Sequence, residues 1–213
     1  MIRAEAGRTA YIVGSGGHAH VIRSLLPHAR IRFLVDRDPG PDDLLQDGFL
    51  ASPDREGDYF IGIGDDLARR RYFDRLKEAG LRQPPCIAPA AWVAADATIG
   101  PGSFVGSGAI LGARSRLGAG AIANTQVSID HDCTVGDFSQ LAPGVTLGGE
   151  VTIGSGCFLG MRACVLPRLE IGDGAFVMAG SLVVRPVAPG TRVGGAPARV
   201  TIPGAAPPFG GAA

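Results

Sequence analysis

Every sixth residue from Ile87 to Val183 is aliphatic, and this period restricts the possible fold more than any other feature of the chain. Neither an α-helix nor an alternating β-strand has a period of six. A hexapeptide β-helix does, because each hexad supplies one short strand and one corner. The positions in phase are Ile87, Val93, Ile99, Val105, Leu111, Leu117, Ala123, Ile129, Val135, Leu141, Leu147, Ile153, Leu159, Val165, Ile171, Val177 and Val183. We therefore predict a parallel β-helix over residues 86–200.

Small residues and glycines repeat with the same period. The position four residues after each aliphatic one is mostly small, as at Ala97, Ser103 and Ala109. A glycine often follows the aliphatic residue directly, and we expect these glycines to adopt corner dihedrals that a Cβ would oppose. They are Gly100, Gly106, Gly112, Gly118, Gly136, Gly148, Gly154, Gly160 and Gly172. Three hexads make one turn, so the repeats predict a prism of a little under six turns, whose handedness the period does not fix.

Charge and hydropathy exclude several classes of partner. Lys plus Arg number 20 and Asp plus Glu number 20, so no global field attracts nucleic acid or an anionic membrane. The first residues lack the apolar core of a signal peptide, and no stretch approaches a membrane-spanning length of uninterrupted apolar residues. We expect a cytoplasmic protein that neither inserts into a membrane nor binds nucleic acid.

The first 85 residues have a different sequence pattern, in which strand and helix signals alternate. The expected strands cover 10–13, 31–36 and 59–63, and the expected helices cover 19–26 and 65–79. The segment 38–58 is rich in Pro, Asp and Gly, which predicts a loop with at most one short helix. Alternating strands and helices favour a small parallel α/β sheet. We predict a half-Rossmann-like α/β domain over 1–85, the β-helix over 86–200 and a flexible tail over 201–213.

A glycine-rich turn follows the first predicted strand. Gly14, Gly16 and Ala19 fit the G-x-G-x-x-A pattern, and Asp36 stands twenty residues after Gly16 at the end of the second strand. Backbone N–H groups at the start of the following helix suit a diphosphate. A domain of this size is half a full dinucleotide fold, which favours a nucleotide diphosphate over NAD. A purely structural glycine turn is the remaining interpretation.

His131 is the one histidine within the hexad region, and Asp130 and Asp132 flank it. It is displaced from the inward aliphatic register, so we expect it to point outward or along a corner. A carboxylate within hydrogen-bond reach orients an imidazole and raises its basicity, which suits a general base. The alternative is a surface histidine beside surface acids. A hexapeptide carbonic anhydrase needs three histidines for zinc, so we predict no metal site.

Several segments together resemble a known enzyme family over residues 9–199. The segments are GSGGHA, FLVD, IGIGDD, ANTQVSIDHDCTVGDFSQLAPGVTLGGEVTIG and PVAPGTRVGGAPAR. They are similar to the nucleotide-sugar N-acetyltransferases of the bacillosamine and perosamine pathways, most of all to GDP-perosamine N-acetyltransferases, and the related sialic acid O-acetyltransferases share the layout. The resemblance implies a left-handed β-helix, a homotrimer, acetyl-CoA bound between prisms and a nucleotide sugar held by the N-terminal domain.

The same resemblance implies roles for individual residues. The catalytic set would be His131 as base, Asp132 as its carboxylate partner and Asn124 near the reacting centre. The acetyl-CoA set would be Gln140, Gly149, Met161 and Ala179. The nucleotide-sugar set would be Gly16, Gly17, His18, Asp36 and Gly64. Some relatives carry a second histidine where this chain has Gln140, and glutamine cannot shuttle a proton, so a two-histidine mechanism is excluded. O-acetylation of a sialic acid and a non-catalytic scaffold remain the alternative functions.

Overall fold

The computed structural model describes residues 8–26, 30–35, 43–45 and 56–203. The chain divides into two compact units, Met1–Ile87 and Ala88–Ala213. The described elements of the first unit are β1 (Thr9–Val13), α1 (Gly17–Ser24), β2 (Arg30–Val35), β3 (Asp43–Leu45), β4 (Gly57–Ile61), α3 (Asp66–Glu78) and the short strand β5 (Cys86–Ile87) at its end. In the described part of the chain, no helix is long and apolar enough to cross a membrane.

The first unit contains a parallel four-stranded sheet in the order β3-β2-β1-β4. Val13, the last residue of β1, pairs with Leu34 of β2 on one side and Ile61 of β4 on the other. The chain thus moves to the opposite side of β1 when it enters β4. In open α/β sheets this reversal leaves a crevice at the carboxyl ends of the strands, where ligands bind. The glycine-rich turn after β1 and the loop after β4 both lie at this edge.

The structure corrects one part of the predicted N-terminal organisation. The predicted loop over 38–58 contains β3, which pairs in parallel with Phe33–Val35 of β2, and its last residues already belong to β4. Three residues are too few to show an alternating pattern, so the pairing with β2, and not local sequence, defines β3. Asp36 and residues 204–213 of the predicted tail lie outside the described residues. Residues 201–203 were also predicted as tail, but they belong to a strand, Arg199–Pro203, that pairs antiparallel with Thr191–Gly194.

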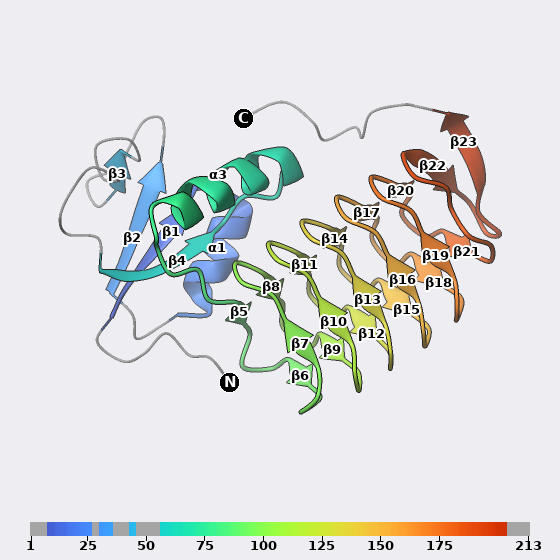
Figure 1. Cartoon of the computed structure of the whole chain (residues 1–213), viewed down its shortest axis with the longest axis horizontal. Helices are drawn as coiled ribbons and strands as arrows, with labels where there is room; N and C mark the ends of the chain where they lie inside the picture. Colours follow the sequence, from blue (N-terminus) through green and yellow to red (C-terminus); the bar gives the residue numbers. More distant parts are fainter. Residues whose placement is uncertain (1–7, 27–29, 36–42, 46–55, 204–213) are drawn as a thin grey trace. The chain divides into compact units, whose positions relative to one another are not determined.

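The second unit is a left-handed parallel β-helix built from two-residue strands, which Figure 1 shows stacked in successive coils. The strands are β6 (Trp92–Val93), β7 (Thr98–Ile99), β8 (Phe104–Val105), β9 (Ile110–Leu111), β10 (Arg116–Leu117), β11 (Ile122–Ala123), β12 (Ser128–Ile129), β13 (Thr134–Val135), β14 (Gln140–Leu141), β15 (Thr146–Leu147), β16 (Thr152–Ile153), β17 (Phe158–Leu159), β18 (Cys164–Val165), β19 (Glu170–Ile171), β20 (Phe176–Val177) and β21 (Leu182–Val183). β5 (Cys86–Ile87) precedes them, and β22 (Thr191–Gly194) and β23 (Arg199–Pro203) follow.

The strands form three sheets, one for each face of the prism. One sheet runs β6-β9-β12-β15-β18-β21, a second β7-β10-β13-β16-β19, and a third contains β8-β11-β14-β17-β20-β22-β23. Each strand pairs with the strand three hexads later, as Ile129 does with Leu147. From Val105 to Val183 the aliphatic residue of each hexad is buried, and Leu111, Leu141 and Leu159 are fully buried. The aliphatic residues predicted from the period therefore form the core of this unit.

The corner glycines serve a different purpose from the one expected. Residues with left-handed backbone lie three positions after the aliphatic residue, and they include Arg114 (φ 58°) and Asp132 (φ 59°). The glycine directly after the aliphatic residue is needed for space: a Cβ at Gly136 would lie 2.5 Å from the backbone of Gly154 in the next coil. The corners of neighbouring coils approach closely at this position, so the glycine requirement is steric and not dihedral.

Candidate functional site

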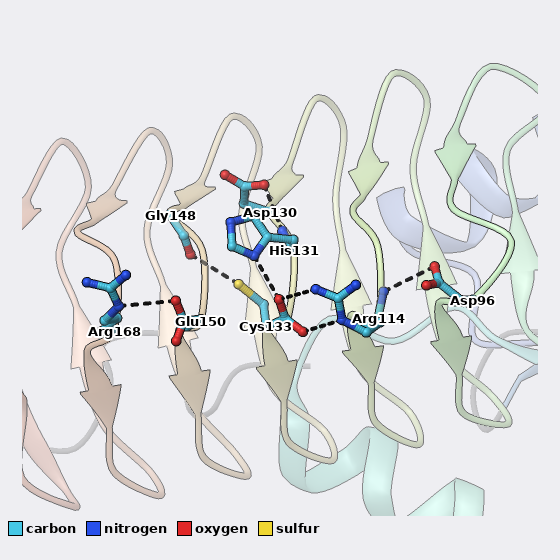
Figure 2. Close-up of polar contacts among 9 residues, drawn as sticks. Asp96, Arg114, Asp130, His131, Cys133, Gly148, Glu150 and Arg168 are labelled. Atoms are coloured by element: carbon cyan, nitrogen blue, oxygen red, sulfur yellow. Dashed lines mark hydrogen bonds and ion pairs between the residues drawn. The ribbon is translucent and has the colours of Figure 1, made fainter.

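His131 lies at the corner 130–133, which follows β12. Its imidazole is about half exposed, and Nδ1 lies 2.8 Å from Asp132 Oδ2. The backbone N–H of His131 donates to Asp130 Oδ1 (2.7 Å), which fixes the turn from the other side. Figure 2 shows His131 and Asp130 at this turn. The structure therefore places His131 and Asp132 in direct contact on an accessible corner.

Hydrogen bonds shift the pKa values of both His131 and Asp132. The bond to Asp132 raises the pKa of His131 above its usual value, and the negative charges of Asp130, Asp132 and Glu150 act in the same direction. The pKa of Asp132 is well below its usual range, first because Arg114 donates to it and then because His131 does. Asp132 thus stays ionised and accepts from Nδ1–H. A neutral imidazole then has Nε2 as its free proton acceptor.

Gly149 lies against the His131 ring, one coil further along the same corner. A Cβ on Gly149 would lie 2.5 Å from His131 Nε2 and 2.6 Å from Cε1. The preceding carbonyl, Gly148 O, accepts a hydrogen bond from Cys133 Sγ (3.1 Å), which ties this turn to the coil before it. The missing side chain of Gly149 therefore leaves room for the imidazole at its reactive edge.

Charged side chains repeat along this corner at intervals of three hexads: Asp96, Arg114, Asp132, Glu150 and Arg168. Arg114 donates from Nε to Asp132 Oδ1 (2.6 Å) and from Nη2 to Asp132 Oδ2 (2.7 Å). Arg168 Nε donates to Glu150 Oε1 (3.1 Å). Figure 2 shows these contacts running from coil to coil. Arg114 was not predicted from the sequence, although opposite charges at this repeat spacing were a visible signal.

The other predicted residues of the β-helix lie elsewhere on the prism. Asn124, Met161 and Ala179 occupy the corner that follows β11, β17 and β20, and Gln140 begins β14 in the same sheet. Asn124 Oδ1 accepts from the N–H of Thr125 (2.8 Å). Met161 is 58% exposed, which is unusual for a large apolar side chain. Among the predicted acetyl-CoA residues, Gly149 thus shares a corner with His131, whereas Met161 and Ala179 share a different corner with Asn124.

Gly16, Gly17, His18 and Gly64, the described members of the predicted nucleotide-sugar set, follow the carboxyl ends of β1 and β4 in the first unit. Gly16 and Gly17 are exposed at the start of α1, and Gly64 follows β4, the neighbour of β1. A Cβ at Gly62 would lie 2.5 Å from Ala19 Cβ, so that glycine lets α1 approach the end of β4. Exposed N–H groups at a helix start beside a second glycine loop form a suitable cradle for a diphosphate.

Two polar side chains, Arg69 and His18, belong to the elements that form this cradle. Arg69 of α3 is 1% exposed, and its Nη1 donates to the carbonyls of Gly64 (2.6 Å) and Ile63 (3.2 Å). Burial, and then the charge of Arg69, lower the pKa of His18 to about 4. His18 is therefore neutral at neutral pH. Arg69 was not predicted from the sequence, although it shares the helical spacing of buried Tyr72, Phe73 and Leu76.

No group of three or more His, Cys, Asp or Glu side chains in the described parts of the chain is arranged to hold a metal ion. The chemistry available at the His131 corner is proton transfer and hydrogen bonding from side chains and backbone.

Comparison with known proteins identifies close relatives. Residues 150–185 match the family described as hexapeptide repeat of succinyl-transferase. The acetyltransferase domain of PglB from Neisseria gonorrhoeae, solved with acetyl coenzyme A, is 31% identical, with a TM-score of 0.85 over 91% of this chain and 99% of that domain. PerB from Caulobacter crescentus, solved with CoA and GDP-perosamine, is 30% identical, with a TM-score of 0.87 over 92% of this chain and 98% of that one. A variant of perosamine N-acetyltransferase from the same organism, also solved with CoA and GDP-perosamine, is 29% identical, with a TM-score of 0.86 over the same shares of the two chains.

Proposed function

The chain belongs to the hexapeptide-repeat nucleotide-sugar N-acetyltransferases, and from this membership we propose that it acetylates the 4-amino group of a nucleotide-linked amino sugar. GDP-perosamine or a close analogue is the proposed acceptor, and acetyl-CoA is the donor. The observation that carries the proposal is the contact between His131 Nδ1 and Asp132 Oδ2 (2.8 Å), which leaves Nε2 as a proton acceptor on an exposed corner. Acetyl-CoA supplies the acetyl group as a thioester.

The proposed reaction gives His131 the proton-transfer role. The sugar amine forms a C–N bond with the acetyl carbon while the C–S bond breaks, and Nε2 of His131 accepts a proton from the nitrogen. The imidazolium is stabilised by the ionised Asp132, and it returns the proton to the departing sulfur. Backbone N–H groups near the site are suited to stabilise the oxyanion that develops at the acetyl group. Because Gly149 has no side chain, the imidazole ring can keep this position against the next coil.

The first unit is proposed to hold the nucleotide. Its exposed glycines at the start of α1 and after β4 suit a diphosphate, and Arg69 fixes the Gly64 carbonyl. Support for GDP over another base comes from the relatives solved with GDP-perosamine.

A homotrimer, with the reaction site between prisms, is the proposed assembly. His131 and Gly149 occupy one corner of a prism, whereas Asn124 and Met161 occupy another, with the face of β12 and β15 between them. A ligand that touches both sets within one chain would have to cross that face. A neighbouring prism brings the two corners together without such a path, so an interchain site explains both sets of predicted residues.

A substrate panel tests the proposal directly. Purified protein is mixed with acetyl-CoA and a GDP-, UDP- or CMP-linked sugar, and free thiol is measured together with the mass of the sugar product. We expect thiol release with a 4-amino sugar nucleotide, and none when either substrate is omitted. A nucleotide sugar with a hydroxyl in place of the amine is the matched control and should give no product.

Two results of this panel would contradict the proposal in different ways. Acetylation of a free sialic acid hydroxyl, without a nucleotide, would assign the chain to O-acetylation. Absence of thiol release with every acceptor, from protein that binds acetyl-CoA in a thermal-shift assay, would favour a non-catalytic scaffold.

The Asp132–His131 bond predicts a specific pH effect. A general base must be neutral, so activity should rise as pH increases through the pKa of His131, which Asp132 holds above its usual value. Asp132→Asn removes the carboxylate, and the acid limb of kcat/KM should move to lower pH while the plateau falls by about tenfold. Both proteins are measured with the same amine, so titration of the acceptor affects them equally. An unchanged acid limb would show that His131 is not the titrating base.

A further inference from the structure

We propose that Arg114 is a positioning residue that holds the Asp132 carboxylate in the orientation in which it bonds His131; this inference rests on the proposed function. Arg114 binds both carboxylate oxygens of Asp132, at 2.6 Å and 2.7 Å. A guanidinium that engages a carboxylate with two parallel N–H groups fixes its plane as well as its position. Oδ2, one of the two bound oxygens, is also the atom that faces His131 Nδ1.

An anchor matters for Asp132 because its carboxylate is partly open to solvent. Its side chain is one-third exposed, so water competes for the carboxylate. Arg114 occupies the same place one coil earlier, with the same left-handed backbone. The N–H of Arg114 donates to Asp96 Oδ1 (3.1 Å), which links its turn to the coil before. A continuous set of contacts thus runs along the corner from Asp96 through Arg114 and Asp132 to His131 (Figure 2).

The chain offers a matched control in Arg168. It lies two coils after Asp132 on the same corner, also has positive φ (61°), and binds a carboxylate. Its partner is Glu150, through a single contact of 3.1 Å. Glu150 meets His131 through a backbone bond, from Glu150 N–H to His131 O (2.9 Å). Removing Arg168 thus costs the same kind of surface ion pair without releasing Asp132.

The test is a double-mutant cycle. We expect Arg114→Met to lower kcat by about tenfold with little change in either KM, and Arg114→Lys to recover part of the loss. Arg168→Met should stay within about twofold of the parent. In an Asp132→Asn background, Arg114→Met should cause no further loss, because the group through which it acts is already gone. An equal loss in both backgrounds would show that Arg114 acts by another route and would overturn the inference.

The pH profile distinguishes positioning from simple charge neutralisation. If Arg114 positions Asp132, Arg114→Met weakens the Asp132–His131 bond and the acid limb moves to lower pH, as with Asp132→Asn. If Arg114 only neutralises the charge of Asp132, Arg114→Met leaves Asp132 with its full negative charge beside His131. The pKa of His131 then rises and the acid limb moves to higher pH, which would contradict the inference. Asp130 and Glu150, the other acidic groups that act on His131, are unchanged in both variants.

Failure of the inference and failure of the proposed function are separable. Thiol release by the parent protein tests the function, whereas the Arg114→Met variant tests the inference. The His131 titration midpoint, followed by NMR, compares the same variants without turnover. A midpoint that stays unchanged, together with full activity of Arg114→Met, would remove Arg114 from the site and leave the proposed function intact.

Discussion

His131→Ala is expected to lower kcat/KM for the amino-sugar nucleotide by about 10²-fold, the low end of the range for general base catalysis. An amine reaches the site partly neutral and already nucleophilic, so it needs less help than a hydroxyl. His131 lies half exposed on a corner and outside the aliphatic core, so the melting temperature should change little. The measurement is kcat/KM over a range of pH, with the melting temperature recorded for each variant.

His131→Asn separates proton transfer from positioning. Asparagine can accept a hydrogen bond but cannot hold the transferred proton, so this variant should be as slow as His131→Ala within a few-fold. A loss below about tenfold for alanine, mostly restored by asparagine, would make His131 a positioning residue. A loss beyond about 10⁴ without restoration would point to a hydroxyl acceptor.

Gly149→Ala is expected to lower kcat by about 10- to 100-fold, approaching the His131→Ala variant. The added methyl group would lie 2.5 Å from His131 Nε2, so the imidazole must turn away and lose its bond to Asp132. The backbone of Gly149 is not in the left-handed region, so alanine fits its dihedrals. Steady-state kinetics with both substrates varied provide the measurement.

The control for Gly149→Ala is the same substitution in the His131→Ala background. With the imidazole gone, the methyl group has free space and should cause no additional loss. A loss of similar size in both backgrounds, with a raised KM for acetyl-CoA, would show that Gly149 acts mainly as a cofactor contact. That outcome would favour the role implied by family resemblance over the contact with His131.

The hexad period was sufficient to predict the β-helix, because each inward position must be apolar to fill the same narrow core. Val105, Ile129 and Leu147, picked from the period alone, are all buried. The pairing of His131 with Asp132 was also predictable, since adjacent residues in a tight turn stay within reach. Strand β3 was not, because its three residues are defined by pairing with β2.

Contacts between coils were harder to predict than the coils themselves. Arg114 lies far from Asp132 in the sequence yet binds it, because three hexads return the chain to the same corner. Gly149 lies beside His131 for the same reason, because it follows His131 by three hexads. Predicting Arg69 required a different inference. A charged residue on the buried face of a helix has to bond to a nearby group, and Arg69 bonds to the carbonyl of Gly64 in the loop after β4.

The pairing of each strand with the strand three hexads later also determines how such a chain can change length. Loss or duplication of one complete coil keeps every other residue on its original face, as the registers of Ser128 with Thr146 and Thr146 with Cys164 illustrate. Loss of a single hexad also preserves the apolar period, but it transfers all later residues to the next face. Such a deletion between Arg114 and Asp132 would leave the core intact and abolish their alignment. Insertion or deletion of a single hexad can therefore leave a β-helix that still folds. Only insertion or deletion of a whole coil also preserves the alignment of the residues at the His131 corner.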